Sequence, residues 1–468
     1  MTTIIAITAL GILCLIFEIF NFRKWIVPFT IIGLSIILGI TVMDDCAVFS
    51  GLKSFNEPSQ YNNMIVVDKF ATAFSSLFIL LTIFLVALSD HFYRAVSSKI
   101  SDFIAIKIFL LVGAIVMVSF GNLAMFFLGI EVLSISLYIL AASNRLNLKS
   151  NEAGMKYFLM GSFASGIMLF GICMIYGAMG SFDLYEIGQM SQSAELPLWY
   201  PIGIVLIAIG MLFKIAAVPF HFWAPDVYEG SPSITTATMS TLAKVVAVAT
   251  FFKLLSALNI DGNEFGISFK IVISVIVTAS MTVGNIMALK QNNVKRMLAF
   301  SGISHAGFML LAMLSLSVST SNLLYYTFAY SLAGISAFSV LLFVCHHLDN
   351  EDIVNFHGLG KTHPLLAAIL TGSLLSMAGI PIFSGFFAKF FMFSQAINSG
   401  YLWLVIVGVI NSIISVGYYF KLIIAMYTKE PNEAKPATPA IIYGVAIVSM
   451  VLNLMIGFFP SLVLNLLK

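Results

Sequence analysis

IGMLFKIAAVPF (209–220) and IPIFSGFFAKFFMF (380–393) decide the fold of this chain, because each stretch places a lysine and a proline in otherwise apolar sequence. An apolar segment of about 20 residues spans a membrane as a helix. Proline interrupts the hydrogen bonding of a helix, and a lysine at the membrane centre costs about 2.5–3.5 kcal/mol to insert. The two stretches therefore predict two interrupted membrane helices, each with a buried ionisable group.

Composition extends this interpretation to the whole chain, 1–468, as a single membrane domain. Of its 468 residues 60% are hydrophobic and 9% are charged, whereas a soluble domain has about 25% charged residues. The sequence predicts an all-α polytopic membrane protein with about fourteen transmembrane helices. These are expected at 3–20, 25–43, 70–89, 103–120, 122–142, 153–178, 200–228, 232–256, 266–289, 296–316, 321–347, 364–398, 400–426 and 438–462.

Basic residues indicate the orientation of these helices, because inner loops are enriched in Lys and Arg. With the N-terminus outside, thirteen basic residues lie in inner segments and three, Lys53, Lys69 and Lys468, in outer ones. The inner residues are Arg23, Lys24, Arg94, Lys99, Arg145, Lys149, Lys156, Lys290, Lys295, Arg296, Lys361, Lys429 and Lys435. We therefore expect both termini outside, and a first helix that is retained, since it lacks the flanks of a signal peptide.

The interrupted helices occupy matching places in two blocks of five helices. In each block the fourth helix holds a lysine and a proline, Lys214 with Pro219 and Lys389 with Pro381. Because five is odd, the second block enters the membrane upside down, which predicts an inverted repeat with ion sites near the interrupted helices. The expected divisions are helices 1–3 in 1–102, the first repeat in 103–256 (helices 4–8), the second in 266–427 (helices 9–13) and helix 14 in 438–462.

Ionisable residues near the middle of these helices are the candidate functional groups. Such residues face a protein interior or a water-filled cavity and mark an ion path. Burial disfavours the charged form of lysine, so a buried lysine can load and release protons, and an approaching carboxylate favours the charged form again. The central candidates are Glu131, Lys214, Lys244 and Lys389.

Snorkelling to the membrane surface is the alternative for any lysine in a membrane helix. We expect it for Lys107, Lys270 and Lys421, which lie near helix ends, and Lys253 is intermediate. Lys156, at the inner end of its helix, is either a path entry or a topological anchor.

Two histidines lie near the central candidates. His221 follows Pro219, and His305 lies in the tenth predicted helix. Histidine accepts and donates protons near neutral pH, which favours a proton relay; a satisfied buried histidine is the alternative. A solvated loop, rather than a metal site, is expected around His346, His347, His357 and His363.

Cysteine spacing and catalytic motifs argue against a cofactor in this chain. Cys14, Cys46, Cys173 and Cys345 show no CxxC pair, so neither an iron–sulfur cluster nor a zinc site is predicted. HGLGKTHP (357–364) lacks the spacing of a phosphate-binding loop. We therefore expect no metal, no bound cofactor and no redox centre here.

Three stretches resemble a known family. FKIAAVPFHFWAPDVYEGSPSITTATMSTLAK (213–244), KRMLAFSGISHAGF (295–308) and SMAGIPIFSGFFAKFFMF (376–393) closely resemble the subunit N family of bacterial respiratory complex I, the NADH-quinone oxidoreductase. The resemblance covers essentially the whole chain, and HFWAPDVYEGSP is its most specific part. It implies an antiporter-like subunit of the bacterial inner membrane, with both termini periplasmic, that translocates protons when quinone is reduced elsewhere in the complex.

The resemblance also implies roles for individual residues and partners. The family's glutamate on helix 5 corresponds to Glu131, and its lysines on helices 7, 8 and 12 correspond to Lys214, Lys244 and Lys389. Family members often have tyrosine where this chain has Phe300, so a hydroxyl role is absent there. NADH, FMN, iron–sulfur clusters and quinone are expected in partner subunits. The expected partners are other complex I membrane subunits, antiporter-like neighbours among them, and lipids, but no nucleic acid.

Three other protein classes compete with this interpretation. A subunit of a multi-subunit cation/proton antiporter shares the fold and the buried lysines, but HFWAPDVYEGSP argues against it. A solute carrier that acts alone would need a more polar lining. An intramembrane enzyme would need a catalytic constellation that the sequence lacks.

Overall fold

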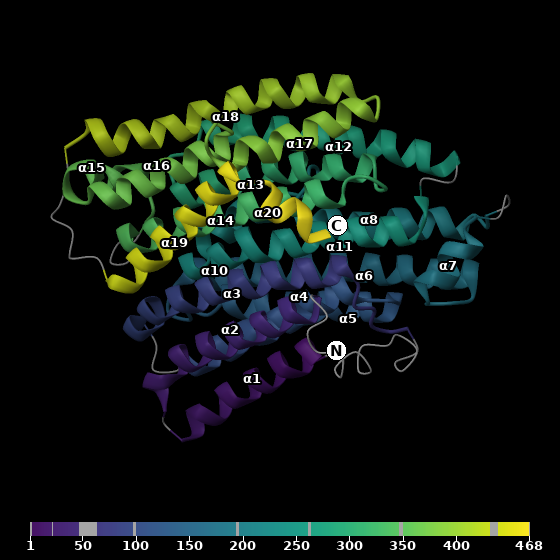
Figure 1. Cartoon of the computed structure of the whole chain (residues 1–468), viewed down its shortest axis with the longest axis horizontal. Coiled ribbons are helices and arrows are strands. Elements are labelled where there is room, and N and C mark those ends of the chain that lie inside the picture. The colour runs from purple at the N-terminus through teal and green to yellow at the C-terminus, as the bar shows by residue number, and fades with distance from the viewer. Residues whose placement is uncertain are drawn as a thin grey trace.

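The computed structural model describes residues 2–20, 22–45, 63–96, 100–192, 196–260, 264–345, 350–430 and 439–467. In these ranges twelve helices are long and apolar enough to cross a membrane. Two shorter apolar helices, Trp199–Ile215 and Pro364–Ala378, each continue into a second helix after a break, and twelve plus two makes fourteen crossings. The predicted all-α polytopic fold is confirmed. The helices lie side by side, from α1 at one edge to α18 at the other (Figure 1).

The helix bounds follow the predicted spans closely. The N-terminal helices are α1 (Thr2–Ile19), α2 (Ile26–Asp45) and α3 (Lys69–Val96). The first block holds α4 (Ile100–Ser119), α5 (Leu123–Ala141), α6 (Leu148–Met179), the short α7 (Leu184–Met190), α8 (Trp199–Ile215), α9 (Trp223–Gly230), α10 (Ser233–Thr238) and α11 (Lys244–Ala257). The second block holds α12 (Glu264–Leu289), α13 (Val294–Leu310), α14 (Thr320–Cys345), the short α15 (Leu359–Thr362), α16 (Pro364–Ala378), α17 (Ser384–Asn398) and α18 (Leu402–Thr428), followed by α19 (Ala440–Phe458) and α20 (Ser461–Leu464).

Both interrupted helices break near the prolines. α8 ends where Ala216 adopts the left-handed conformation (φ 60°) and donates its N–H to the carbonyl of Leu212. α16 ends in the same way at Gly379 (φ 88°). Pro219 and Pro381 come next, and proline cannot continue the helical ladder. The left-handed residue therefore ends each first half, and the proline keeps the helix from resuming at once.

The eighth crossing has an irregularity that the sequence did not predict. Between α10 and α11 the chain makes a π-helical turn over Met239–Ala243, and the N–H of Lys244 bonds to the carbonyl of Met239. Such turns are frequent at functional sites. Here the residue that follows is the central lysine candidate.

Matching features recur at the second helix of each block. Asn122 caps the start of α5 and Asn293 caps the start of α13. Each asparagine also forms an isolated antiparallel bridge with an aspartate beyond the block's third helix, Asp183 or Asp352. These features agree with the predicted repeat, whose inverted arrangement stays a prediction.

Residues expected on the inner side meet at one end of the molecule, which we call the inner end. Arg296 contacts Asp226 there at 2.8 Å, and Lys295 contacts Glu351 at 2.8 Å. Lys253 lies at the opposite, outer end and faces Asp68 at 3.7 Å. Which end faces the cytoplasm stays a prediction.

Several residues named above lie outside the described residues: Cys46, Lys53, Lys99, His346, His347, Lys435, Lys468 and the side chain of Arg94.

One snorkelling prediction is wrong. Lys107 is only 2% exposed and donates a hydrogen bond to Ser89, because α3 covers this face of α4. Lys421, by contrast, is exposed and bonds to the carbonyl of Gln291 at the inner end. Nearness to a helix end therefore did not decide exposure; the neighbouring helix did.

Candidate functional site

Lys214 lies in a polar cluster between α8 and α5. Its ammonium donates to the Ser134 hydroxyl (2.6 Å) and the Tyr138 hydroxyl (3.2 Å). Glu131 precedes these two on the same face of α5, since their spacings are close to whole helical turns. The Glu131 carboxylate interacts electrostatically with Lys214, yet its Oε1 atom is buried without a hydrogen-bond partner. Glu131 thus lies within electrostatic range of Lys214, whereas the hydrogen bonds of Lys214 go to the hydroxyl groups of Ser134 and Tyr138.

The break after Lys214 is held by two hydrogen bonds. The indole N–H of Trp223 donates to the carbonyl of Phe213 (3.0 Å), which also accepts the N–H of Ala216 at the helix end. The N–H of Val218 donates to the Ser280 hydroxyl on α12 (2.9 Å). The second bond ties the break in the first block to the second block.

Lys244 is buried, and its Nζ atom has no hydrogen-bond partner. Gly302 on α13 leaves room for it, because a Cβ atom there would lie 2.5 Å from that nitrogen and 3.2 Å from the Tyr330 hydroxyl. The Tyr228 ring centre lies 5.9 Å away. A buried polar atom without a partner is costly and requires an explanation, and a group that exchanges protons provides one.

His305 lies between phenol groups. Its Nδ1 atom is 2.8 Å from the Tyr326 hydroxyl, and its Nε2 atom is 3.4 Å from the Tyr419 hydroxyl. It interacts electrostatically with both Lys389 and Lys244. A neutral imidazole has one donor and one acceptor nitrogen, and a phenol can be either, so this arrangement can accept a proton on one side and release it on the other.

Lys389 lies beyond the second break and reaches back across it. Its ammonium donates to the carbonyl of Ala378 (2.9 Å), the last residue of α16, and the Phe308 ring centre is 4.9 Å away. The C-terminal end of a helix favours positive charge. A cavity of about 10 Å³ separates this break from His305 and is lined by His305, Tyr326, Tyr330, Ser376 and Ala388 among others.

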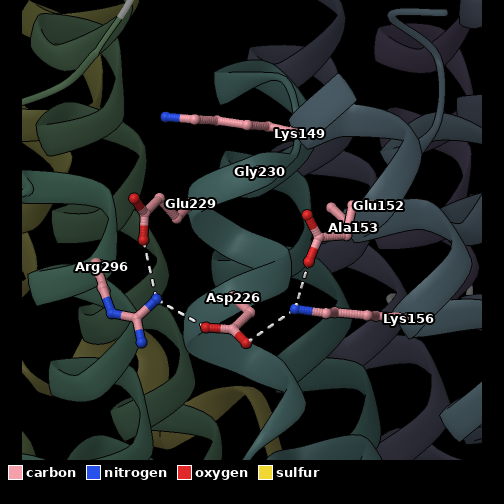
Figure 2. A pocket seen from close by; sticks show the side chains of 8 residues that line it. All are labelled: Lys149, Glu152, Ala153, Lys156, Asp226, Glu229, Gly230 and Arg296. Atoms are coloured by element: carbon pink, nitrogen blue, oxygen red, sulfur yellow. Dashed lines mark hydrogen bonds and ion pairs between the residues drawn. The ribbon is translucent and has the colours of Figure 1, made fainter. Parts of the chain in front are cut away.

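Lys156 belongs to a charged pocket of about 210 Å³ at the inner end (Figure 2). Its ammonium contacts Glu152 at 2.7 Å and Asp226 at 3.3 Å. Arg296 contacts the other oxygen of Asp226 and also Glu229, at 2.9 Å. Two carboxylates thus hold Lys156 in a solvent-accessible pocket, a position that suits a path entry as well as a topological anchor.

His221 lies within the first break and is buried, with its Nδ1 atom unpartnered. Its ring contacts that of Phe222 at 4.6 Å. The structure does not bring it into hydrogen-bond contact with Lys214. Among the described residues, no group of three or more His, Cys, Asp or Glu side chains could hold a metal ion.

Sequence reasoning missed the hydroxyl groups around the ionisable residues. Ser134 and Tyr138 follow Glu131 at helical spacing, and that pattern could have found them. Tyr326, Tyr330 and Tyr419 come from helices far along the chain, and no local signal marks them. Gly302 was missed for the same reason.

Comparison with known proteins shows the family of the chain. Residues 121–415 match the family described as NADH:quinone oxidoreductase/Mrp antiporter, TM. The chain is 69% identical over 472 residues to NADH-quinone oxidoreductase subunit N of Flavobacterium johnsoniae, covering 100% of both chains. It is 42% identical to the subunit N of Cytophaga hutchinsonii, covering 100% of this chain and 99% of the other.

Two solved structures have a similar fold. One is a chain of respiratory complex I from Thermus thermophilus with bound aureothin, with TM-score 0.83 and 28% identity over 99% of this chain and 98% of that one. The other is a chain of the Mrp complex from Dietzia, with TM-score 0.86 and 20% identity over 99% and 95%, a likeness of fold alone. From the full-length sequence matches, this chain belongs to the subunit N family of NADH-quinone oxidoreductase.

Proposed function

We propose that the chain is a proton-translocating membrane subunit of NADH-quinone oxidoreductase. The observation that carries this proposal is Lys244, a mid-helix lysine that is buried with an unpartnered Nζ atom. Lys214 lies in the preceding interrupted helix, and the electrostatic influence of Lys244 reaches His305. The residues that we propose to move protons are Glu131, Lys214, Lys244, His305 and Lys389, with Lys156 and His221 as candidates for access to them.

Electrostatic repulsion supplies the coupling between these sites. Two neighbouring cations repel strongly in a low-dielectric interior, so a lysine that gains a proton favours release from the next. The Glu131 carboxylate favours the charged form of Lys214. A change in the position of Glu131 would therefore start a lateral transfer toward Lys389.

We further propose that the electron transfer takes place in partner subunits. NADH, FMN, iron–sulfur clusters and quinone would bind there, and antiporter-like membrane subunits would flank this chain. The absence of CxxC spacing supports this division. Copurification of the chain with a quinone-reducing assembly supports the proposal, whereas copurification with a cation/proton antiporter alone favours that alternative.

The function is tested with Lys244→Met in the complete complex. Proton uptake into membrane vesicles and NADH oxidation are measured together, and assembly is checked on a native gel. We expect assembled complexes with strongly reduced proton uptake. Lys421→Met, at an exposed position, is the control. Normal proton uptake by an assembled Lys244→Met complex would overturn the role of this lysine.

The orientation is tested separately. Reporter fusions in the loops that hold Arg145 and Lys295 should report the cytoplasm, because these loops carry the basic residues. If either loop is labelled from the outside, the predicted topology is wrong.

A further inference from the structure

Two aromatic rings lie next to the residues that line the charged pocket of the inner end. Tyr157 follows Lys156 on α6, and Trp223 lies one turn before Asp226 on α9. Their ring centres are 4.5 Å apart and their planes differ by 8°. Each side chain is 3% exposed. The rings therefore form a closed apolar layer directly beside an ionic layer.

The same two rings contact the surroundings of Lys214. The Trp223 indole donates to the carbonyl of Phe213, the residue before Lys214. The Tyr157 ring meets the Tyr138 ring edge-on at 4.8 Å, and Tyr138 accepts a hydrogen bond from Lys214. Contacts thus lead from the pocket through Trp223 and Tyr157 to the buried lysine.

We propose that Trp223 and Tyr157 form an aromatic gate between the inner charged pocket and Lys214. The inference rests on the proposed function, because it names the access route to that lysine. The rings come from α9 and α6, so a shift of α9 against α6 separates them and admits water. A proton-translocating chain needs such a barrier, since aqueous access to a central lysine from both sides at the same time would let protons leak.

Asp226 is the positioning residue of this gate. It accepts contacts from Lys156 of α6 (3.3 Å) and from Arg296 of α13 (2.8 Å) (Figure 2). It therefore joins α9 to both neighbours just above the stacked rings. Gly230 allows the close fit of α9, because a Cβ atom there would lie 2.6 Å from the carbonyl oxygen of Lys149. Loss of the Asp226 charge removes the tie of α9 to α6 and weakens the tie to α13, where Glu229 still contacts Arg296, and it touches neither ring.

The gate is tested by access to a cysteine placed behind it. Ser134→Cys is labelled with a small cationic thiol reagent in vesicles that expose the inner end, and the parent chain gives the background from native cysteines. When Trp223→Leu, which removes the stacked ring, is added to Ser134→Cys, the cysteine should be labelled several-fold faster than in Ser134→Cys alone. Trp223→Phe retains an aromatic ring and should label at the slow rate. Trp199→Leu is the matched control, because Trp199 is 54% exposed and starts the same crossing.

A second measurement covers variants that assemble poorly. Asp226→Asn leaves both rings in place and should raise labelling and passive proton permeability by less than Trp223→Leu does. Glu430→Gln, in the exposed pair with Lys361, is its control and should change neither. Neither readout requires NADH turnover, so failure of the gate leaves the proposed function standing. Equal, slow labelling of Ser134→Cys with and without the added Trp223→Leu or Asp226→Asn substitution would overturn the gate.

Discussion

The two interrupted helices hold their lysines in different ways. Lys214 lies before its break, and its ammonium donates hydrogen bonds to hydroxyl groups of α5, with the Glu131 carboxylate within electrostatic range. Lys389 lies after its break and bonds to the backbone carbonyl that ends α16, with an aromatic ring beside it. The same pattern of lysine and proline thus produces two environments.

The difference separates a lysine that has a side-chain carboxylate within electrostatic range from one that bonds to a backbone carbonyl. A carboxylate can approach or withdraw, so it can switch the protonation of Lys214. A helix end is fixed, and its partial negative charge stabilises Lys389 constantly. We therefore propose that the first break controls the protonation of its lysine and that the second break takes part in the transfer, with Lys244 and His305 between them.

The largest effect is expected from Lys389→Arg. Arginine keeps the positive charge and can still bond to the carbonyl of Ala378, but it scarcely deprotonates. Assembly should persist while proton uptake falls by roughly 100-fold, since a positioned proton-transfer group contributes about 10²–10⁴-fold. NADH-driven uptake into vesicles measures this, with assembly confirmed on a native gel. An assembled complex that takes up protons at the normal rate would contradict the titrating role of Lys389.

The control assigned to the first break is tested by a double-mutant cycle. Glu131→Ala and Lys214→Ala should each reduce proton uptake. Groups in one network couple by about 0.5–3 kcal/mol, so the double variant should lose less than the product of the two single losses. Glu131→Ala combined with Lys421→Met provides an additive reference. Strict independence of Glu131 and Lys214 would rule out the pair, although not their individual roles.

The connection between the breaks is tested with Gly302→Ala. The added methyl group would lie 2.5 Å from the Lys244 Nζ atom, so the lysine or α13 must shift. Overpacking of this kind costs about 1–3 kcal/mol, and proton uptake should fall while assembly persists. Gly166→Ala on α6 is the matched control, because nothing lies within 4 Å of the new atom there. Equal proton uptake in both variants would contradict the role of Gly302 as the space for Lys244.

The smallest effect is expected from Tyr326→Phe. The substitution removes the hydroxyl group that contacts His305 Nδ1 and keeps the aromatic ring of residue 326. A hydrogen bond of this kind contributes about 0.5–1.5 kcal/mol. Proton uptake should fall modestly. Tyr325→Phe loses a comparable bond to the carbonyl of Ile456 without touching His305, so it should pump normally. If both variants take up protons at the same rate, the hydroxyl of Tyr326 makes no specific contribution to proton transfer.

The first break and its residues were largely readable in the sequence. The proline at 219, the central position of Lys214 and the helical spacing of Glu131 are local features, and helix formation and membrane insertion depend on local hydrophobicity. The second break was located as well. Its lysine contact was not, because a bond to Ala378 depends on how α17 folds back over the end of α16.

The sequence by itself determined the number of crossings, the two breaks and the central positions of Lys214, Lys244 and Lys389, because each depends on the length and polarity of one continuous segment. Only the tertiary structure decided what those lysines contact. Ser134 and Lys214 are 80 residues apart, and His305 and Tyr419 are 114 apart. Such pairs form when distant helices pack, and Lys107 shows the same dependence, since a neighbouring helix buried a residue that its own helix left near an end.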